Sequence, residues 1–378
     1  MTFTFSEEQK ILKDSAREFV RDRAPVTRLR KTRDDKKNGR DDELWKSMAE
    51  LGWTGIIVPE DHGGAGLGYV GLGLVLEETG RTLASSPLLS TAMIGASALL
   101  LGGSDAQKKA HLPAIAEGRT ITALAIEESA HHNPHRVAAK AEKAGSGYTL
   151  NGYKSFVADG HTASLFIVSA RTSGNTGNTG DAKGITLFLV KGDAAGLSRH
   201  ELVTVDSRGA ADITFTNVAA EPLGPIDGGA ALLDQILDRA RIGLAAEMLG
   251  QAEAAFEMTT EYIKTRKQFG QVIGGFQAIQ HRAAKMFTDF EMTKSCVRAA
   301  LDALDRNDPK IAEWASLAKA RACETLHLVS NETVQMHGGI GMTDAHEAGL
   351  YLKRARVAEG LYGGESFHRD RYARLLGY

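Results

Sequence analysis

Two segments in the last third of the chain carry side chains suited to holding a phosphorylated ligand. The first, Tyr262–Gln280 (YIKTRKQFGQVIGGFQAIQ), places Arg266 where a helix is expected to end, just before a Phe-Gly turn. A guanidinium offers a planar fork of donors that matches a pyrophosphate, although a basic residue there also complements the helix dipole. The second, Gln335–Gly341 (QMHGGIG), combines amide donors with glycines that let a ligand approach the backbone, although glycines also end helices. The residues alone leave both alternatives open.

Other motifs for chemistry are weaker. The glycine-rich stretch His62–Gly73 lacks the GK[ST] of a phosphate-binding loop, so a tight connection between helices is favoured. The run His131–His135 (HHNPH) has no suitably spaced cysteine or carboxylate, so we predict a surface loop and no metal site. Walker, HExxH, GxSxG and CxxC motifs do not occur in the sequence.

Composition limits the class of protein. The 378 residues are 43% hydrophobic and 24% charged, which is typical of a soluble globular protein with two or three packed subdomains. A net charge of −2 argues against a nucleic-acid partner bound through phosphate neutralisation. Two cysteines and the lack of a basic, then apolar, leader predict a cytoplasmic protein. The apolar stretch Pro87–Gly103 is interrupted and shorter than the about 20 residues of a membrane span, so we expect a buried helix instead.

The elements that must position these segments change in periodicity twice. Apolar residues recur at helical spacing to about residue 120, in short alternating runs to about residue 223, and at helical spacing again from Gly228. We therefore predict an α+β multidomain chain with an N-terminal helical domain (1–120), a central antiparallel β-barrel or sandwich (121–224) and a C-terminal helical bundle (225–378). Asn151-Gly152 is expected to be a turn between two strands, and Arg171–Lys183 a surface loop.

Four separated segments together resemble the acyl-CoA dehydrogenase family, in the family's order and over essentially the whole chain. Leu51–Arg81 matches its early pattern, Tyr148–Gly160 (YTLNGYKSFVADG) its YxLNGxKxWITNG, Tyr262–Gln280 its YxxxRxxFGxxIxxFQxxQ, and Val334–Gly341 its VQxxGGxGy. The resemblance implies an N-terminal helical domain, a β-barrel and a C-terminal four-helix bundle. It also implies a tetramer, composed of one chain or of this chain with another family member, with flavin at the domain junction.

The family's chemistry implies roles for particular residues. FAD takes a hydride from Cβ of an acyl-CoA thioester in fatty acid metabolism, a carboxylate removes the α-proton, and an electron-transfer flavoprotein is the acceptor. The resemblance places three sets of residues around these groups. The first set lies on the FAD of a neighbouring subunit, and consists of Arg266, Gln268 and Phe269, together with Gln335, Gly338 and Gly339 at the diphosphate. The second set lies on the flavin ring system, and consists of Phe156 and Ala158. The third set lies at the substrate, and consists of Arg241, Tyr362 and Gly363.

The chain departs from the family next to the flavin. Phe156-Val157-Ala158 replaces Trp-Ile-Thr, so a hydroxyl that would hydrogen-bond flavin N5 is missing at Ala158. Because one net hydrogen bond contributes about 0.5–1.5 kcal/mol, we expect flavin still to bind, with an altered redox poise. The run Glu127–Asn133 (EESAHHN) stands where the family has TEPxAGSD.

Both positions at which the family carries its catalytic base lack a carboxylate. They are occupied by Gly363 and by Ala240, the residue before Arg241. Three alternatives follow: Glu365 acts as the base of a self-sufficient dehydrogenase, the chain is the base-lacking subunit of a heteromeric enzyme, or the fold performs other flavin chemistry such as oxygenation. Gly363→Glu is expected to raise desaturation if the rest of the pocket is intact. The sequence does not specify the acyl chain.

Overall fold

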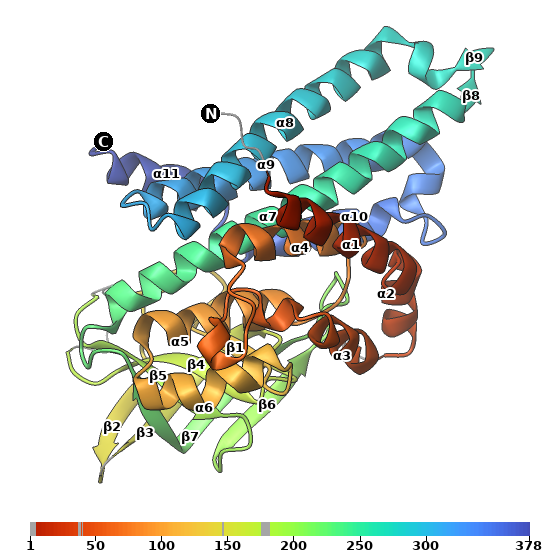
Figure 1. Ribbon diagram of the computed structural model, residues 1–378. Coiled ribbons are helices and arrows are strands. Elements are labelled where there is room, and N and C mark those ends of the chain that lie inside the picture. Colours follow the sequence, from red (N-terminus) through yellow and green to blue (C-terminus); the bar gives the residue numbers. More distant parts are fainter. Residues whose placement is uncertain (1–4, 37–38, 40, 146, 175–181) are drawn as a thin grey trace. The chain divides into compact units, whose positions relative to one another are not determined.

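The computed structural model describes residues 5–36, 39, 41–145, 147–174 and 182–378, which form two compact units (Figure 1). The helical unit comprises Met1–Lys31, Tyr69–Ala84 and Arg241–Tyr378, and the barrel unit comprises Thr32–Gly68 and Ser85–Ala240. The predicted division into three domains at residues 120 and 224 stays a prediction. No helix in the described ranges is long and apolar enough to cross a bilayer.

Long helices build the helical unit. Its elements are α1 (Glu7–Arg23), α4 (Gly68–Arg81), α7 (Gly229–Thr265, in this unit from Arg241), α8 (Gln277–Asp305), α9 (Ile311–His337), α10 (Ala348–Gly360), α11 (Glu365–Leu375) and the hairpin of β8 (Lys267–Gln268) and β9 (Gln271–Val272). Helices α4 and α7 cross so closely that a Cβ at Gly80 would lie 2.1 Å from the Glu247 carbonyl oxygen. Only glycine permits this approach.

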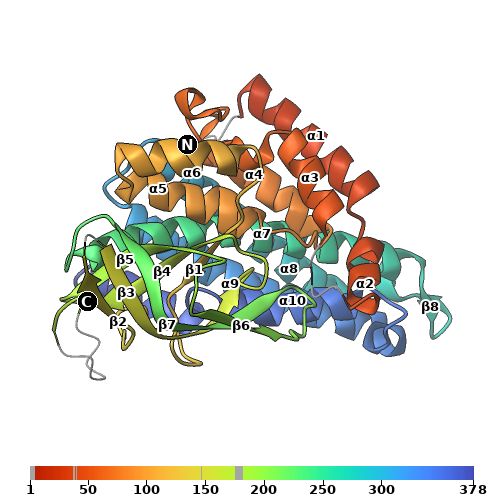
Figure 2. The same ribbon diagram turned by 90° about the horizontal axis from the view of Figure 1, so that it is seen from below.

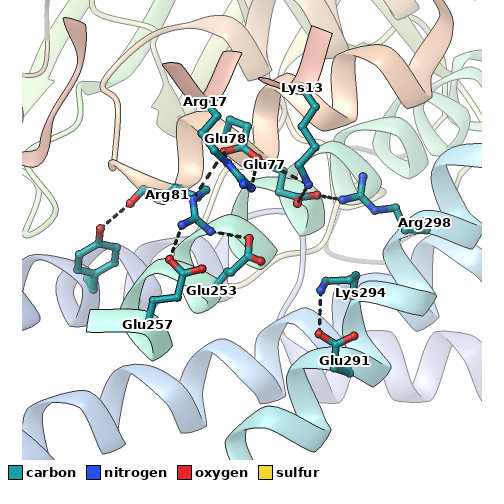
Figure 3. Close-up of polar contacts among 11 residues, drawn as sticks. Lys13, Arg17, Glu77, Glu78, Arg81, Glu253, Glu257, Glu291, Lys294 and Arg298 are labelled. Carbon is teal, nitrogen blue, oxygen red and sulfur yellow. Dashed lines mark hydrogen bonds and ion pairs between the residues drawn. The ribbon is translucent and has the colours of Figure 1, made fainter. Parts of the chain in front are cut away.

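Buried charges tie α1, α4 and α8 together (Figure 3). Glu77 and Glu78 on α4 have no exposed surface. Glu77 accepts from Lys13 Nζ at 2.7 Å and pairs with Arg298, while Glu78 binds the Arg17 guanidinium through two bonds of 2.9 and 3.1 Å. The network continues to α7 through Arg81, Glu253 and Glu257. Because buried charges are costly unless paired, these contacts fix the packing of α4.

Among the described residues of the barrel unit, seven strands form one sheet, drawn in Figure 2, and five of them (β2, β3, β4, β5 and β7) close into a ring. The order is β1-β4-β2-β3-β7-β5, with β5 pairing back to β4 and β6 pairing with β7. Strand bounds are β1 (Thr122–Ala125), β2 (Lys140–Ala144), β3 (Gly147–Ala158), β4 (Leu165–Arg171), β5 (Ile185–Lys191), β6 (Leu197–Leu202) and β7 (Ala210–Leu223). The predicted barrel is confirmed, but the sheet is mixed, because β4 runs parallel to β1 and β2.

One predicted turn is wrong. Asn151-Gly152 lies inside the continuous strand β3, at a register shift against β7, and not between two strands. Gly152 has φ of 155°, and a Cβ there would lie 2.5 Å from the Ala139 Cβ, so the glycine serves a bulge. The predicted loop at Arg171–Lys183 falls partly outside the described residues, which omit 175–181.

Further helices in the barrel unit are α3 (Asp42–Glu50), the π-helix η3 (Leu89–Gly95), α5 (Ala96–Gly102) and α6 (Asp105–Ala116), and α2 (Val26–Asp34) joins the two units. The predicted buried helix at Pro87–Gly103 is confirmed as η3 followed by α5. It packs on β1, where the Thr122 hydroxyl donates to the Ser90 carbonyl at 2.7 Å. The short connection predicted at His62–Gly73 ends earlier, because Gly68 already begins α4.

Candidate active site and cofactor-binding segments

The turn before α11 brings the predicted substrate-site residues of the helical unit together. Tyr362 and Gly363 are buried and have positive φ of 57° and 103°. The Tyr362 carbonyl accepts from Arg241 Nε at 3.1 Å, so a residue at the start of the bundle and the turn near the C-terminus share one site. Arg241 also stacks on the Phe367 ring, with its guanidinium carbon 5.5 Å from the ring centroid.

Two further buried side chains hold the same turn. His368 Nε2 lies 3.1 Å from the Tyr362 carbonyl oxygen, and because a carbonyl can only accept, Nε2 carries the proton. Lys319 Nζ on α9 donates to the Gly363 carbonyl at 3.1 Å, and also to Cys323 Sγ and the carbonyls of Ala358 and Glu359. Neither His368 nor Lys319 has any exposed surface.

Burial and positive charge determine the protonation state of this cluster. Burial, the largest cause, and the nearby charges of Arg241 and Lys319 together lower the pKa of His368 to about 2. Burial also lowers the pKa of Lys319, against a raising effect of Cys323 and Glu359. The imidazole is therefore a neutral hydrogen-bond donor and not a proton acceptor at neutral pH.

Lys319, Phe367 and His368 were not predicted as site residues. A signal for Lys319 was present, because it interrupts the alanine stripe of α9 with a charge that must find partners inside the bundle. Phe367 and His368 gave no motif signal, since only the folded turn brings them against Gly363.

Gly363 has no room for a side chain in this conformation. A Cβ would lie 2.6 Å from Phe367 Cδ1 and 2.9 Å from His368 Nε2, at a φ that other residues rarely adopt. The expectation that Gly363→Glu raises desaturation requires a pocket with room for a side chain. The surroundings of Gly363 do not provide that room.

The other candidates for the base are differently placed. Glu365 begins α11, its carboxylate is 2.8 Å from Arg369 Nε, and its side chain is 40% exposed. Ala240 is fully buried. The Glu365 carboxylate is therefore engaged by Arg369 on the same helix, and among the described residues no hydrogen bond joins it to Gly363.

The predicted cofactor segments of the helical unit meet at one end of the bundle. After α7, Arg266 enters the β8–β9 hairpin, which projects from α7 and α8 in Figure 1. At its tip Phe269 is 92% exposed and has φ of 52°, followed by Gly270 with φ of 80°, as in a two-residue hairpin turn. Arg266 is exposed and has no ion-pair partner among the described residues.

The glycine segment after α9 adjoins this hairpin's base. The Tyr262 ring stacks on His337, with ring centroids 4.3 Å apart. Tyr262 lies four residues before Arg266, and His337 directly precedes Gly338. A Cβ at Gly338 or Gly339 would meet nothing within 4 Å, so the backbone there is open to a ligand. Exposed guanidinium, exposed amides at Gln268 and Gln335, and open glycine backbone are a donor set that fits a dinucleotide diphosphate.

The flavin-facing candidates of the barrel unit lie at a bulge of β3. Phe156 has φ of 46° and donates its N–H to Asp212 Oδ1 at 2.9 Å, while its ring is 39% exposed. Ala158 pairs with Ala210 of β7. The Ser155 N–H donates to the Glu127 carbonyl at 2.8 Å, which joins this bulge to the chain after β1.

Carboxylates brace the segment that replaces the family's TEPxAGSD. Glu128 accepts from Lys154 Nζ at 2.7 Å and from the N–H groups of Ala138 and Ala139 at 2.6 and 3.0 Å. Lys154 is fully buried, and burial lowers its pKa. Glu127 pairs with His132, so both acidic side chains serve the loop's own structure. In the described part of the chain, no group of three metal-ligating side chains is found.

Three family models match the chain. They are the N-terminal domain of acyl-CoA dehydrogenase at residues 6–119, the middle domain at 125–218 and the C-terminal domain at 227–377.

Individual relatives agree with these matches. The short/branched chain specific acyl-CoA dehydrogenase of Bos taurus is 30% identical over 372 residues, covering 96% of this chain and 84% of the relative. A solved structure from work on the electron transferring flavoprotein of Acidaminococcus fermentans is 29% identical, covers all of both chains and has a TM-score of 0.93. A variant of the steroid ACAD Tcur3481-Tcur3483 is 33% identical, covers 98% of both chains and has a TM-score of 0.88.

The predicted family and cofactor are confirmed at the level that these matches reach. The three domain matches follow one another over nearly the whole chain, in the order that the sequence motifs indicated. The chain therefore belongs to the acyl-CoA dehydrogenase family and is an oxidoreductase of this FAD-dependent flavoprotein class.

Proposed function

We propose that this chain is the base-lacking subunit of a heteromeric FAD-dependent enzyme that desaturates an acyl-CoA thioester between Cα and Cβ. The observation that carries the proposal is the state of Gly363, where a positive φ and the side chains of Phe367 and His368 exclude a carboxylate. The second family position for a base holds the buried Ala240. Glu365 is held by Arg369, which argues against a self-sufficient enzyme.

When bound, FAD supplies the acceptor for the hydride that leaves Cβ. The residues proposed to hold it have exposed donors, an exposed aromatic ring or open backbone: Arg266, Gln268 and Phe269 for the FAD of a neighbouring subunit, Gln335, Gly338 and Gly339 for its diphosphate, and Phe156 and Ala158 for its ring system. The projection of the β8–β9 hairpin from the helical unit supports a role across a subunit boundary.

The substrate's thioester carbonyl is assigned to the turn at Gly363. Within the described chain, the N–H groups of Gly363 and Gly364 have no hydrogen-bond acceptor. Removal of the α-proton puts charge on the carbonyl oxygen, which such donors stabilise. Arg241 supports the same turn through the Tyr362 carbonyl.

Other components follow from the same proposal. The glutamate that takes the α-proton comes from a second family member in the complex, and an electron-transfer flavoprotein accepts the electrons. The relatives include a short/branched chain specific acyl-CoA dehydrogenase and a steroid ACAD, so we propose a branched acyl group as the substrate class.

Co-purification tests the proposal. The tagged chain is isolated from its native host, and the complex is read by mass and by its visible absorption spectrum. The proposal predicts a yellow complex containing a second acyl-CoA dehydrogenase-type chain with glutamate at its base position. A complex of this chain alone, or a colourless one, contradicts it.

A further inference from the structure

The peptide groups on either side of Gly363 are held at their carbonyl oxygens and free at their N–H groups. The carbonyl of the Tyr362–Gly363 peptide accepts from Arg241 Nε and His368 Nε2, both at 3.1 Å. The carbonyl of the Gly363–Gly364 peptide accepts from Lys319 Nζ at 3.1 Å. Their N–H groups have no acceptor in the described part of the chain.

This arrangement strengthens the two N–H groups as donors. A hydrogen bond to a peptide oxygen draws electron density from the nitrogen of the same peptide, so successive hydrogen bonds polarise one another. Charged donors do this more strongly than neutral ones. Two of the three donors here, Arg241 and Lys319, are cationic side chains and are buried, where their fields are weakly screened.

We propose that His368 and Lys319 are positioning residues that, with Arg241, orient and polarise the Gly363 and Gly364 N–H groups for the thioester carbonyl oxygen. The proposal rests on the proposed thioester site and assigns to that site two residues beyond the turn itself. Neither His368 nor Lys319 needs to touch the substrate.

The properties of the two side chains fit this task. With its pKa lowered to about 2, His368 stays neutral and keeps its Nε2 proton on the Tyr362 carbonyl across the working pH range. Lys319 has no carboxylate within ion-pair distance in the described ranges, so its ammonium group is directed wholly at carbonyls and at Cys323. A buried charge without an ion-pair partner is costly, so packing alone does not account for a lysine at this position.

The experiment measures carbonyl polarisation directly. The enzyme, as purified with any partner chain, is loaded with the branched product analogue 2-methylcrotonyl-CoA, isotope-labelled at the thioester carbonyl, and the carbonyl stretch is read by infrared difference spectroscopy. His368→Leu and Lys319→Met remove one donor each. His368→Gln keeps an amide donor for the Tyr362 carbonyl. Arg371→Gln is the matched control, because Arg371 anchors the same helix to Ala312 and Ser316 on α9.

We expect the wild-type enzyme to shift the carbonyl band to lower frequency than in water. His368→Leu and Lys319→Met should return the band toward the position in water, while His368→Gln and Arg371→Gln should leave it shifted. With a turned-over acyl-CoA, the two donor-removing variants should lower kcat about tenfold with little change in KM, less than the about 10²–10³-fold loss of a direct donor.

The outcomes separate the possibilities. A folded, FAD-loaded His368→Leu enzyme with an unchanged band and kcat overturns the inference, and Lys319→Met gives the same test if His368→Leu does not fold. Equal losses in Arg371→Gln would mean that looser packing of α11, and not donor removal, causes the effect. A wild-type enzyme that does not shift the band at all overturns the proposed thioester site itself.

Discussion

Restoring a glutamate at Gly363 is expected to damage the protein before it can help catalysis. A Cβ at this position lies 2.6 Å from Phe367 Cδ1 and 2.9 Å from His368 Nε2, and φ is 103°. The left-handed backbone costs a non-glycine residue about 1–2 kcal/mol. Overpacking of a filled site adds about 1–3 kcal/mol. Gly363→Glu should therefore lower the free energy of unfolding by about 2–5 kcal/mol and should not raise desaturation by the chain alone.

Gly363→Ala separates the causes, because it shares the backbone strain and the Cβ contacts but carries no carboxylate. Urea midpoints at constant m-value measure stability, and reduction of an artificial acceptor by acyl-CoA measures desaturation. We expect alanine to show most of the loss of stability. The reasoning is refuted if Gly363→Glu is as stable as the wild type and makes the isolated chain an active dehydrogenase.

Three further predictions concern charged groups. Glu77→Gln should lower the free energy of unfolding by about 3–5 kcal/mol, because it leaves the buried Arg298 guanidinium without its ion-pair partner. Glu257→Gln, at the exposed end of the same network, should lower it by at most about 1 kcal/mol. Urea midpoints measure both, and equal losses would contradict the difference in burial. The pKa of His368 is lowered from 6.5 in the unfolded chain to about 2 in the folded protein. The free energy of unfolding is therefore unaffected by this group above about pH 6.5 and decreases as pH falls below that value, because the unfolded chain takes up the proton. At about pH 5 the wild type should have lost about 2 kcal/mol relative to His368→Leu, and parallel pH profiles would count against this. Glu365→Gln should leave acyl-CoA desaturation by the intact complex unchanged in a steady-state assay. Loss of desaturation in this variant would instead identify Glu365 as the base.

The order of helical and alternating segments was predictable because each period reports which face of an element is buried. The closed ring of strands followed from many short runs without helices between them. The direction of β1 against β4 did not, because strand pairing partners are not encoded in local alternation. Asn151-Gly152 was misassigned since positive φ serves a bulge as well as a hairpin turn.

The two segments singled out for cofactor binding carry motifs whose residues are close together in sequence, and their assignment to FAD stays a prediction. Arg266 and Gly338 meet through Tyr262 and His337, and both segments had been singled out for their donors. The cluster around Gly363 was only half predictable. Its donors come from α7, α9 and α11, more than 100 residues apart at the extremes, and a buried donor to a carbonyl leaves no spacing pattern in the sequence.

The most direct measurement is flavin reduction by acyl-CoA without oxygen, with this chain purified alone and then in complex with a partner that carries the glutamate. If Gly363 leaves the chain unable to take the α-proton, the visible flavin band of the chain alone should stay unchanged, and that of the complex should bleach. Bleaching of the flavin on the chain alone, at the rate of the complex, would contradict the assignment of this chain as a subunit without its own base.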